Sequence, residues 1–320
     1  MSQLRVAVVG AGPKGRQHVN VLHDFEDVDL VALCDPVDEV RDSVGDAFHV
    51  PNRYADLDAM LDVETLDAVF LGTPPQLNAP IAQICVERGL HTFLEKPPGM
   101  NTEETEALRD AVDRTGVKAM VGLNRRFHPI INRALEMVRE RGPVVQLVGE
   151  FHKSLEGIIT RNKYPFPVLD NFLMTNDIHA IDIVRFMAGA EVKQVHSFAR
   201  RVNSPYRNVH AALVRFDNDI IASYTFNYTT GDRLERYEIH GIGVSAYLEG
   251  VKRGTVFCSG ERHDLTEAEW GASGGTVEED RFFLDCIQKD RPVTLPGASM
   301  DEAVKTAKLV DAIREGIIEP

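Results

Sequence analysis

The stretch LRVAVVGAGPKG, residues 4–15, constrains the fold of this chain more than any other. It opens with an almost unbroken apolar run, which is typical of a strand buried on both faces. The run ends in Gly10, Gly12 and Gly15, spaced G-x-G-x-x-G at the start of a helical pattern. In that context the glycines permit a tight turn, close approach of the backbone to a pyrophosphate and close helix–strand packing. The sequence therefore predicts a dinucleotide-binding strand–turn–helix.

The same alternation of short β-rich runs and helical patterns continues through residues 1–122. Repeated β-α-β units with short connections predict a doubly wound parallel sheet, that is, a Rossmann NAD-binding domain. Residues 123–320 have a different texture, with long alternating runs and few helices. They are predicted to form an α+β domain for substrate binding and oligomerisation, built on an open, mainly antiparallel sheet with flanking helices. Within it, DND (217–219) reads as a hairpin turn, and residues 261–280 as a long surface loop.

Composition narrows the classes of partner. The formal net charge of −14 argues against non-specific binding to nucleic acid or to an anionic membrane. The four cysteines are far apart and form no CxxC pair, so buried free thiols are expected rather than a metal or redox site. No apolar run approaches the length of a bilayer span, and the N-terminus lacks a signal-peptide pattern. We therefore expect a cytoplasmic protein.

Asp35 ends the second predicted strand, 20 residues after Gly15 (35 − 15), the offset expected for a ribose-binding acid. A carboxylate there accepts hydrogen bonds from both ribose hydroxyls and repels a 2′-phosphate. Pro36 follows it where an NADP site would carry Arg or Ser. The sequence favours NAD over NADP, although Asp35 could also simply begin the next helix.

EKPPG, residues 95–99, directly follows the apolar strand HTFL. Two prolines fix the backbone where Lys96 emerges. Because ligands bind beyond the carboxyl ends of the strands in a doubly wound sheet, Lys96 is expected to face the cofactor. A solvated lysine paired with Glu95 is the alternative, but it does not explain the prolines.

TNDIHAID, residues 175–182, is the second candidate for chemistry. On a helix, His179 and Asp182 share a face, with Asn176 and Asp177 near the first turn. Histidine is the usual group for proton transfer near neutral pH. A structural histidine is the alternative interpretation.

The segments GAGPKGRQHV, CDP, GTPPQLNAPIA, EKPPG, GLNRRFHP and NDIHAIDIVRFMAG occur in the order found in the Gfo/Idh/MocA oxidoreductases, and the chain resembles that family over essentially its whole length. These are the relatives of glucose–fructose oxidoreductase and inositol 2-dehydrogenase. The resemblance implies that Lys96 is the EKP lysine and that His179 is the catalytic histidine, with Asp182 its neighbour. Two positions depart from the family: Thr175 stands where many members have Asp, and Asn78 where many have His.

Residues and resemblance together give three sets of expected site residues. The cofactor-binding set is Gly10, Gly12, Pro13, Lys14, Gly15, Asp35, Thr73, Pro74, Asn78, Glu95, Lys96 and Asn124. The catalytic set is Lys96, His179 and Asp182. The substrate-binding set is Lys96, Arg126, Lys153, Asn176, Asp177 and His179, and no metal is expected.

The expected activity is NAD(P)-dependent hydride transfer between a nicotinamide cofactor and a secondary alcohol or ketone of a sugar, cyclitol or related polyol. Lys96 would hydrogen-bond the reacting oxygen and His179 would take or relay its proton. Which of the two is the base is left open. A redox-neutral enzyme with tightly bound NAD and a non-catalytic NAD-binding regulator are the alternatives. An intact Lys96 and His179 argue against the regulator.

The strands expected between about 192 and 258 are too sparsely accompanied by helices to have both faces covered. Their large apolar residues fall on both sides of the pleat: Phe226, Tyr228, Tyr247, Leu248 and Phe257. A homodimer or homotetramer through this sheet is therefore expected.

Overall fold

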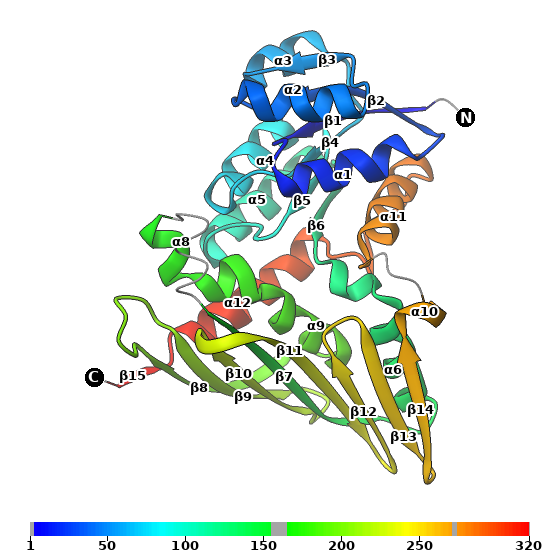
Figure 1. Ribbon diagram of the computed structural model, residues 1–320. Helices are drawn as coiled ribbons and strands as arrows, with labels where there is room; N and C mark the ends of the chain where they lie inside the picture. Colours follow the sequence, from blue (N-terminus) through cyan, green and yellow to red (C-terminus); the bar gives the residue numbers. More distant parts are fainter. Residues whose placement is uncertain (1–2, 155–164, 271–273, 320) are drawn as a thin grey trace. The chain divides into compact units, whose positions relative to one another are not determined.

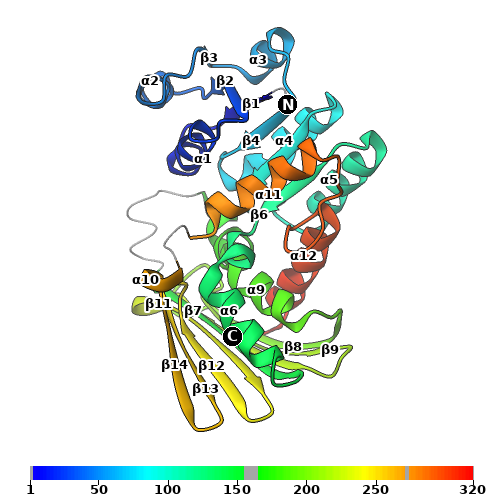
Figure 2. The same cartoon turned by 90° about the vertical axis from the view of Figure 1, so that its right-hand side faces the viewer.

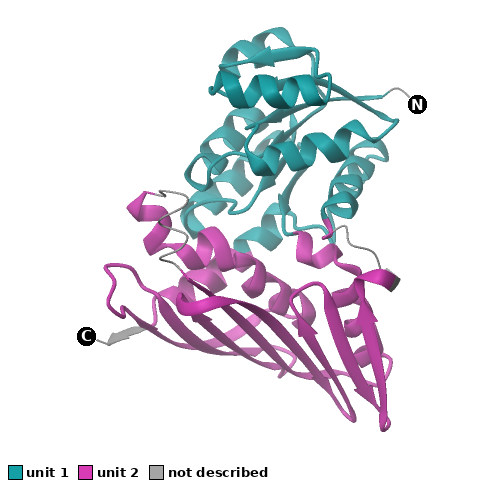
Figure 3. Ribbon diagram, viewed as in Figure 1, with its two compact units in different colours: residues 1–123, 276–304 teal, residues 124–275, 305–320 magenta. Residues whose placement is uncertain are grey.

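The computed structural model describes residues 3–154, 165–270 and 274–319. The chain divides into two compact units (Figures 1 and 3). Unit 1 holds Met1–Leu123 and Thr276–Val304, and unit 2 holds Asn124–Gly275 and Lys305–Pro320. The division after Leu123 lies beside the expected boundary. The return of residues 276–304 to unit 1 differs from the expected single second domain of 123–320.

Unit 1 is built on a six-stranded sheet in the order β3-β2-β1-β4-β5-β6, with every pair parallel. The strands are β1 (Leu4–Val9), β2 (Val28–Cys34), β3 (Asn52–Tyr54), β4 (Ala68–Leu71), β5 (His91–Glu95) and β6 (Ala119–Gly122). The chain runs outward from β1 to β3 and then restarts at β4, so the strand order reverses between β1 and β4. This is the point at which doubly wound folds bind ligands, and it confirms the predicted Rossmann sheet.

Helices cover both faces of this sheet (Figure 2). They are α1 (Pro13–His23), α2 (Asp38–Ala47), α3 (Leu57–Val63), α4 (Asn78–Glu87), α5 (Thr102–Thr115) and α11 (Thr276–Gln288), with a 3-10 turn at Pro75–Leu77. On one face, α1 packs against α11, and Phe283 of α11 lies edge-on to Phe70 and Phe93 of the sheet. Right-handed crossovers place α4 and α5 on the other face. Asn101 caps α5 by accepting a hydrogen bond from the Glu104 N–H.

Unit 2 is built on a nine-stranded sheet in the order β14-β13-β12-β11-β7-β10-β9-β8-β15. Its strands are β7 (Val144–Ser154), β8 (Val192–Arg200), β9 (Val209–Phe216), β10 (Ile221–Asn227), β11 (Thr229–Gly241), β12 (Val244–Glu249), β13 (Arg253–Cys258), β14 (Glu261–Thr266) and β15 (Ile317–Glu319). Only the β7–β10 and β8–β15 pairs among these strands are parallel. The mainly antiparallel sheet and the β9–β10 hairpin at 217–219 are confirmed.

The helices of unit 2 lie along one face of this sheet, and the described part of the chain places none on the other (Figures 1 and 2). They are α6 (Pro129–Arg139), α8 (Phe166–Asp170), α9 (Ile178–Ala188), α10 (Glu267–Trp270) and the latter part of α12 (Met300–Arg314), with a 3-10 turn at Asn124–Phe127 and a π-turn at Leu173–Asp177. The apolar alternation of the strands follows from this one-sided cover. Phe226 and Leu248 are buried on the helix side, whereas Tyr247 and Phe257 are exposed.

The surface loop predicted for residues 261–280 is wrong, because β14, α10 and the start of α11 occupy most of it. β14 is an edge strand that pairs with β13, and its residues other than Leu265 are polar, with Arg262 and Asp264 forming an ion pair. α11 begins with Thr276 and buries Glu279 and Asp280, charged residues that a sequence pattern assigns to the surface. No helix among the described residues is long and apolar enough to cross a membrane.

The turns after β1 and β4 pack backbone against backbone at the switch point. Gly10 has φ 89°, and a Cβ there would lie 2.7 Å from the Gly72 carbonyl oxygen. A Cβ on Gly15 would lie 1.6 Å from the Gly10 carbonyl oxygen. A Cβ on Gly12 would meet nothing within 4 Å, and its φ of −61° suits any residue. The three glycines thus have different physical requirements.

We expect Gly15→Ala to lose more than about 3 kcal/mol of unfolding free energy, because backbone cannot yield to the added methyl. Gly12→Ala should lose less than about 1 kcal/mol, because its methyl meets open space. Urea unfolding followed by circular dichroism measures both. Equal stabilities for the two variants would contradict this packing of the turn.

Candidate active site

The glycine turn leaves the N-terminus of α1 open. Gly12 is the N-cap residue of α1 and supplies no capping side chain, and Pro13 occupies the first turn. The first amides of a helix have no partners within the helix and favour an anion. Because a Cβ on Gly12 would contact nothing, a pyrophosphate has room to approach these amides. The turn thus fits the phosphates of a dinucleotide.

Asp35 lies at the end of β2, beside the same turn. Its carboxylate accepts hydrogen bonds from the Ala11 N–H at 2.7 Å and the Val37 N–H at 2.8 Å. Each bond uses a different oxygen, so each oxygen keeps a lone pair for a further donor. Asp35 therefore ties the turn to β2 and can still accept from ribose hydroxyls.

Asn78 fixes the backbone of the EKP segment by hydrogen bonds. Its amide nitrogen donates to the Glu95 carbonyl at 2.8 Å and to the Pro97 carbonyl at 3.0 Å, on either side of Lys96. Its oxygen accepts from the Thr73 hydroxyl at 2.6 Å, just before Pro74 and the 3-10 turn. Asn78 is fully buried. Asn78 therefore fixes the backbone around Lys96, and its expected place in the cofactor site stays a prediction.

Glu95 is buried at the end of β5, whereas Lys96 is half-buried. One Glu95 oxygen is 2.8 Å from Lys14 Nζ and 3.5 Å from His18 Nε2, and the other accepts from the Lys96 N–H at 3.2 Å. Burial alone would raise the pKa of Glu95, but Lys14 and His18 outweigh it and hold that pKa well below its usual range. Lys14 thus reaches from the glycine turn to the EKP segment.

The sequence analysis did not identify His18 or its partner Asp280 on α11 as site residues. Their carboxylate–imidazole contacts are 2.8 and 3.1 Å, and both side chains are fully buried. One signal could have pointed to His18: it lies one turn after Lys14 on the same helix face. No local signal pointed to Asp280, which is 262 residues away from His18.

His179 lies in the first turn of α9 in unit 2 and is 6% exposed. The π-turn Leu173–Asp177 runs directly into this helix. Such turns shift side chains by one position relative to a regular helix and are frequent at functional sites. Thr175, where many family members have Asp, donates its hydroxyl to the Val168 and Asn171 carbonyls, so it serves the backbone. Asp177 is the buried acid near His179.

Lys153 on β7 faces this π-turn. Its ammonium donates to Asn176 Oδ1, lies 3.3 Å from Asp177 Oδ1 and sits 4.1 Å from the centre of the Phe151 ring. Burial lowers the pKa of Lys153, against the opposing effect of Asp177. Three of the expected substrate-binding residues are therefore brought together. Their polar atoms are partly committed to one another.

Arg126 and Asp182 form a buried ion pair. Arg126 donates twice to Asp182, at 2.7 and 2.6 Å, and Asp182 also accepts from Thr306. Arg126 is 0% exposed and Asp182 1% exposed. The pair fixes α9, which carries Asp182, and the catalytic role of Asp182 and the substrate-binding role of Arg126 stay predictions.

Asn124 belongs to unit 2, where its amide donates to the Gly274 carbonyl and its oxygen accepts from Arg125. Lys96 lies in unit 1 and His179 in unit 2. The sequence offers two further cations, Arg161 and Lys163, that could meet a phosphate or carboxylate of a substrate, and both lie outside the described residues. Among the described residues, no group of three or more His, Cys, Asp or Glu side chains could hold a metal ion.

Two domain models match the chain, together over more than half of it: an oxidoreductase family with an NAD-binding Rossmann fold at residues 4–123, and the GFO/IDH/MocA C-terminal domain at residues 164–245. D-apiose dehydrogenase of Paraburkholderia graminis is 27% identical, covering 98% of this chain and 87% of the relative. scyllo-Inositol 2-dehydrogenase (NAD(+)) of Bacillus subtilis is 28% identical, covering 73% and 71%.

Solved structures share the fold. A levoglucosan dehydrogenase in complex with NADH and levoglucosan has a TM-score of 0.83 at 20% identity, covering 98% of this chain and 96% of that one. An oxidoreductase from Agrobacterium radiobacter has a TM-score of 0.82 at 19% identity, covering 97% and 95%. With two matching domain models and relatives along its length, this chain belongs to the Gfo/Idh/MocA family of oxidoreductases.

Proposed function

We propose that this protein is an NAD(P)-dependent dehydrogenase that moves a hydride between a nicotinamide cofactor and a secondary alcohol or ketone of a sugar, cyclitol or related polyol. The observation that carries this proposal is the Glu95–Lys96–Pro97 segment, braced by Asn78 and Glu95 at the carboxyl end of β5. The names of relatives that act on D-apiose and scyllo-inositol support the substrate class. A panel of sugars and polyols, followed by NADH and NADPH absorbance, tests it. No turnover with any member would contradict the proposal.

The chemistry assigned to the protein is the handling of charge and a proton. Oxidising an alcohol removes a hydride from carbon and a proton from the hydroxyl, leaving a carbonyl. A bound nicotinamide supplies the hydride acceptor, or the donor in reverse. The Lys96 ammonium would stabilise negative charge developing on the substrate oxygen. His179 would take the hydroxyl proton, or Lys96 would take it when it enters the reaction as the neutral amine. Asn176, Asp177 and Lys153 would hold other substrate hydroxyls.

Lys96→Ala should lower kcat at least about a hundredfold, roughly 3 kcal/mol of transition-state stabilisation. NAD affinity should stay within about threefold of wild type, because the glycine turn binds the phosphates. Lys289→Ala is the matched control, since Lys289 is an exposed lysine of the same unit that pairs with Asp285. Turnover by the Lys96 variant that equals the control would remove Lys96 from the mechanism.

We propose NAD as the preferred cofactor. Support comes from the Asp35 carboxylate, which is held beside the glycine turn with one lone pair on each oxygen left for ribose hydroxyls. Asp35→Ser combined with Pro36→Arg should narrow or invert the NAD to NADP ratio in kcat/KM, because the change removes repulsion and adds a cation for the 2′-phosphate. Steady-state kinetics with both cofactors measure this ratio. A wild-type enzyme that prefers NADP tenfold would overturn the assignment.

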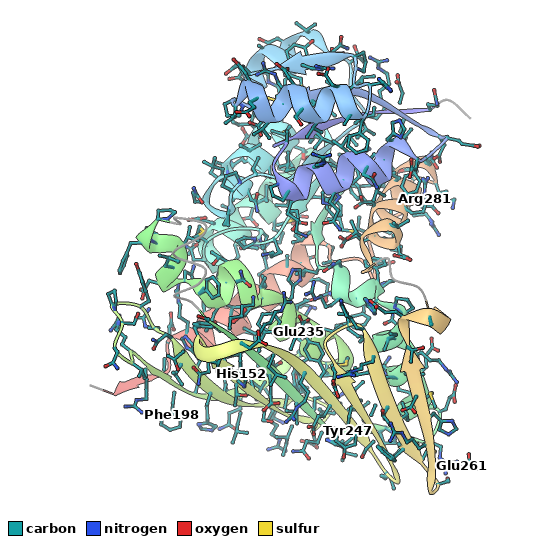
Figure 4. The ribbon with its side chains drawn as sticks, viewed as in Figure 1. His152, Phe198, Glu235, Tyr247, Glu261 and Arg281 are labelled. Atoms are coloured by element: carbon teal, nitrogen blue, oxygen red, sulfur yellow. The ribbon has the colours of Figure 1, made fainter. Side chains whose placement is uncertain are left out.

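We also propose a homodimer or homotetramer that buries the helix-free face of the unit 2 sheet. Large apolar side chains stand exposed on that face at both ends of the sheet: Phe198, Leu213 and Ile221, and then Tyr247 and Phe257. Figure 4 shows Phe198 and Tyr247 on the side away from the helices. Arg236, paired with Glu150 and Glu238, lies between these two groups. This mixture of apolar and paired polar residues suits an isologous contact.

Light scattering at micromolar concentration should give a multiple of the monomer mass, and Leu213→Lys should shift the population toward monomer. Val63→Lys is the control, because Val63 is 71% exposed on unit 1. A wild-type mass near 35.6 kDa would refute the oligomer.

We propose that the protein works in the cytoplasm, since all four cysteines are free thiols.

A further inference from the structure

A chain of buried charged groups runs from α11 to the EKP segment within unit 1. Asp280 contacts His18 Nδ1 at 2.8 and 3.1 Å, and His18 Nε2 lies at ion-pair distance, 3.5 Å, from Glu95 Oε1. Each ring nitrogen thus faces a carboxylate. A neutral imidazole has only one N–H to donate, whereas an imidazolium has two. The geometry therefore fits a protonated His18.

Glu95 connects His18 to Lys96, the residue proposed to act on the substrate. Its Oε1 also meets Lys14 Nζ at 2.8 Å, and its Oε2 accepts from the Lys96 N–H at 3.2 Å. Lys14 and His18 lie one turn apart on α1, and both contact Glu95 Oε1. A shift of the Glu95 carboxylate would therefore move both the backbone of Lys96 and the side chain of Lys14.

Acidic and basic side chains alternate in the cluster. Burial and the neighbouring Asp280 raise the pKa of Glu279 well above its usual range. Glu95 and Asp280 face His18 and Lys14, with Lys96 adjacent. Burial raises the pKa of Asp280, against the opposing effect of His18. Burial alone would lower the pKa of His18, but Asp280 and Glu95 outweigh it and raise that pKa to about 10.

We propose that His18 and Asp280 are positioning residues: Asp280 holds His18 as an imidazolium, and His18 fixes Glu95 so that Lys96 and Lys14 are correctly placed. The catalytic part of this inference rests on the proposed dehydrogenase function, whereas the charge state of His18 does not. Helix α11 makes other contacts within unit 1. Gln17 donates to Thr276, and Asp27 contacts Arg281 and Gln288. Those contacts do not touch Glu95 and provide a matched control.

The first test reads the charge of His18 directly. Long-range ¹H–¹⁵N spectra of protein labelled at histidine nitrogen distinguish an imidazolium from either neutral tautomer. A histidine with the ordinary pKa of about 6.5 is neutral at pH 8.5. We expect one imidazolium at pH 8.5 in the wild type and none in Asp280→Asn or His18→Gln. Neutral rings throughout the folded wild type at pH 8.5 would overturn the proposal.

The charge of His18 also predicts how the unfolding free energy depends on pH. The folded pKa of about 10 exceeds the ordinary 6.5, so the stabilising contribution of His18 is full below about pH 6.5 and is lost as pH rises through 10. The stability difference between wild type and His18→Gln should therefore shrink from pH 7 to pH 10. Urea unfolding across that range measures it. A difference that is constant or grows with pH would contradict a charged His18.

The second test separates positioning from simple structural support. Asp280→Asn keeps the shape of the side chain and should lower kcat about tenfold, with the substrate KM changed less than about threefold, because misplacement acts on the reacting group. It should also weaken NAD binding, titrated by fluorescence without turnover, through Lys14. Asp27→Asn, which removes an α11 ion pair elsewhere, should leave kcat and NAD affinity unchanged.

In a double-variant cycle, Asp280→Asn should have little further effect on kcat once His18 is Gln, because Asp280 acts through His18. The pH profile of kcat should shift in both single variants, which loss of stability alone would not cause. If Asp280→Asn matched Asp27→Asn in kcat, NAD affinity and pH profile, the cluster would serve folding only and the proposal would fail. If no substrate is found, the imidazolium spectra and the NAD titrations still decide it.

Discussion

The Glu95 carboxylate is the interaction on which the order of unit 1 around its candidate site depends. A buried carboxylate costs several kcal/mol unless it is paired and hydrogen-bonded. Glu95 meets that requirement with Lys14 from the glycine turn, His18 from α1 and the backbone of Lys96. The compensation therefore links the turn that would hold the phosphates to the lysine that would meet the substrate. Stability and function use the same contacts here.

The return of residues 276–304 to unit 1 brings α11 beside the buried Glu95 and His18 and stabilises their charges. Phe283 of α11 packs against Phe70 and Phe93, which form the apolar floor under His18. On the same helix, Asp280 supplies the counter-charge that the N-terminal sequence lacks. A Rossmann sheet made from the first 123 residues alone would leave His18 facing only Glu95 and would expose these rings. The unit is completed from the other end of the chain.

Unit 2 meets the same constraint with a different arrangement. Arg126 and Asp182 neutralise each other beneath α9, with Thr306 as a further donor to the carboxylate. His179 lies in the buried first turn of the same helix, and the preceding π-turn presents Asn176 and Asp177 toward Lys153. Removing either member of a buried pair leaves an uncompensated charge.

The sequence by itself determined the elements whose cause is local. The spacing of Gly10, Gly12 and Gly15 after an apolar run reports the backbone conformation that a tight turn needs, and strand alternation reports which face is buried. Family resemblance pointed to Lys96 and His179. Tertiary structure alone decided where the charged side chains find partners. Asp280 looks like an ordinary surface residue in the sequence, and Asn78 and Arg126 were expected to face ligands, yet each is buried against a group distant along the chain. A pattern of neighbouring residues carries no record of such pairings, because the free energy that buries a charge comes from a partner that only folding brings near.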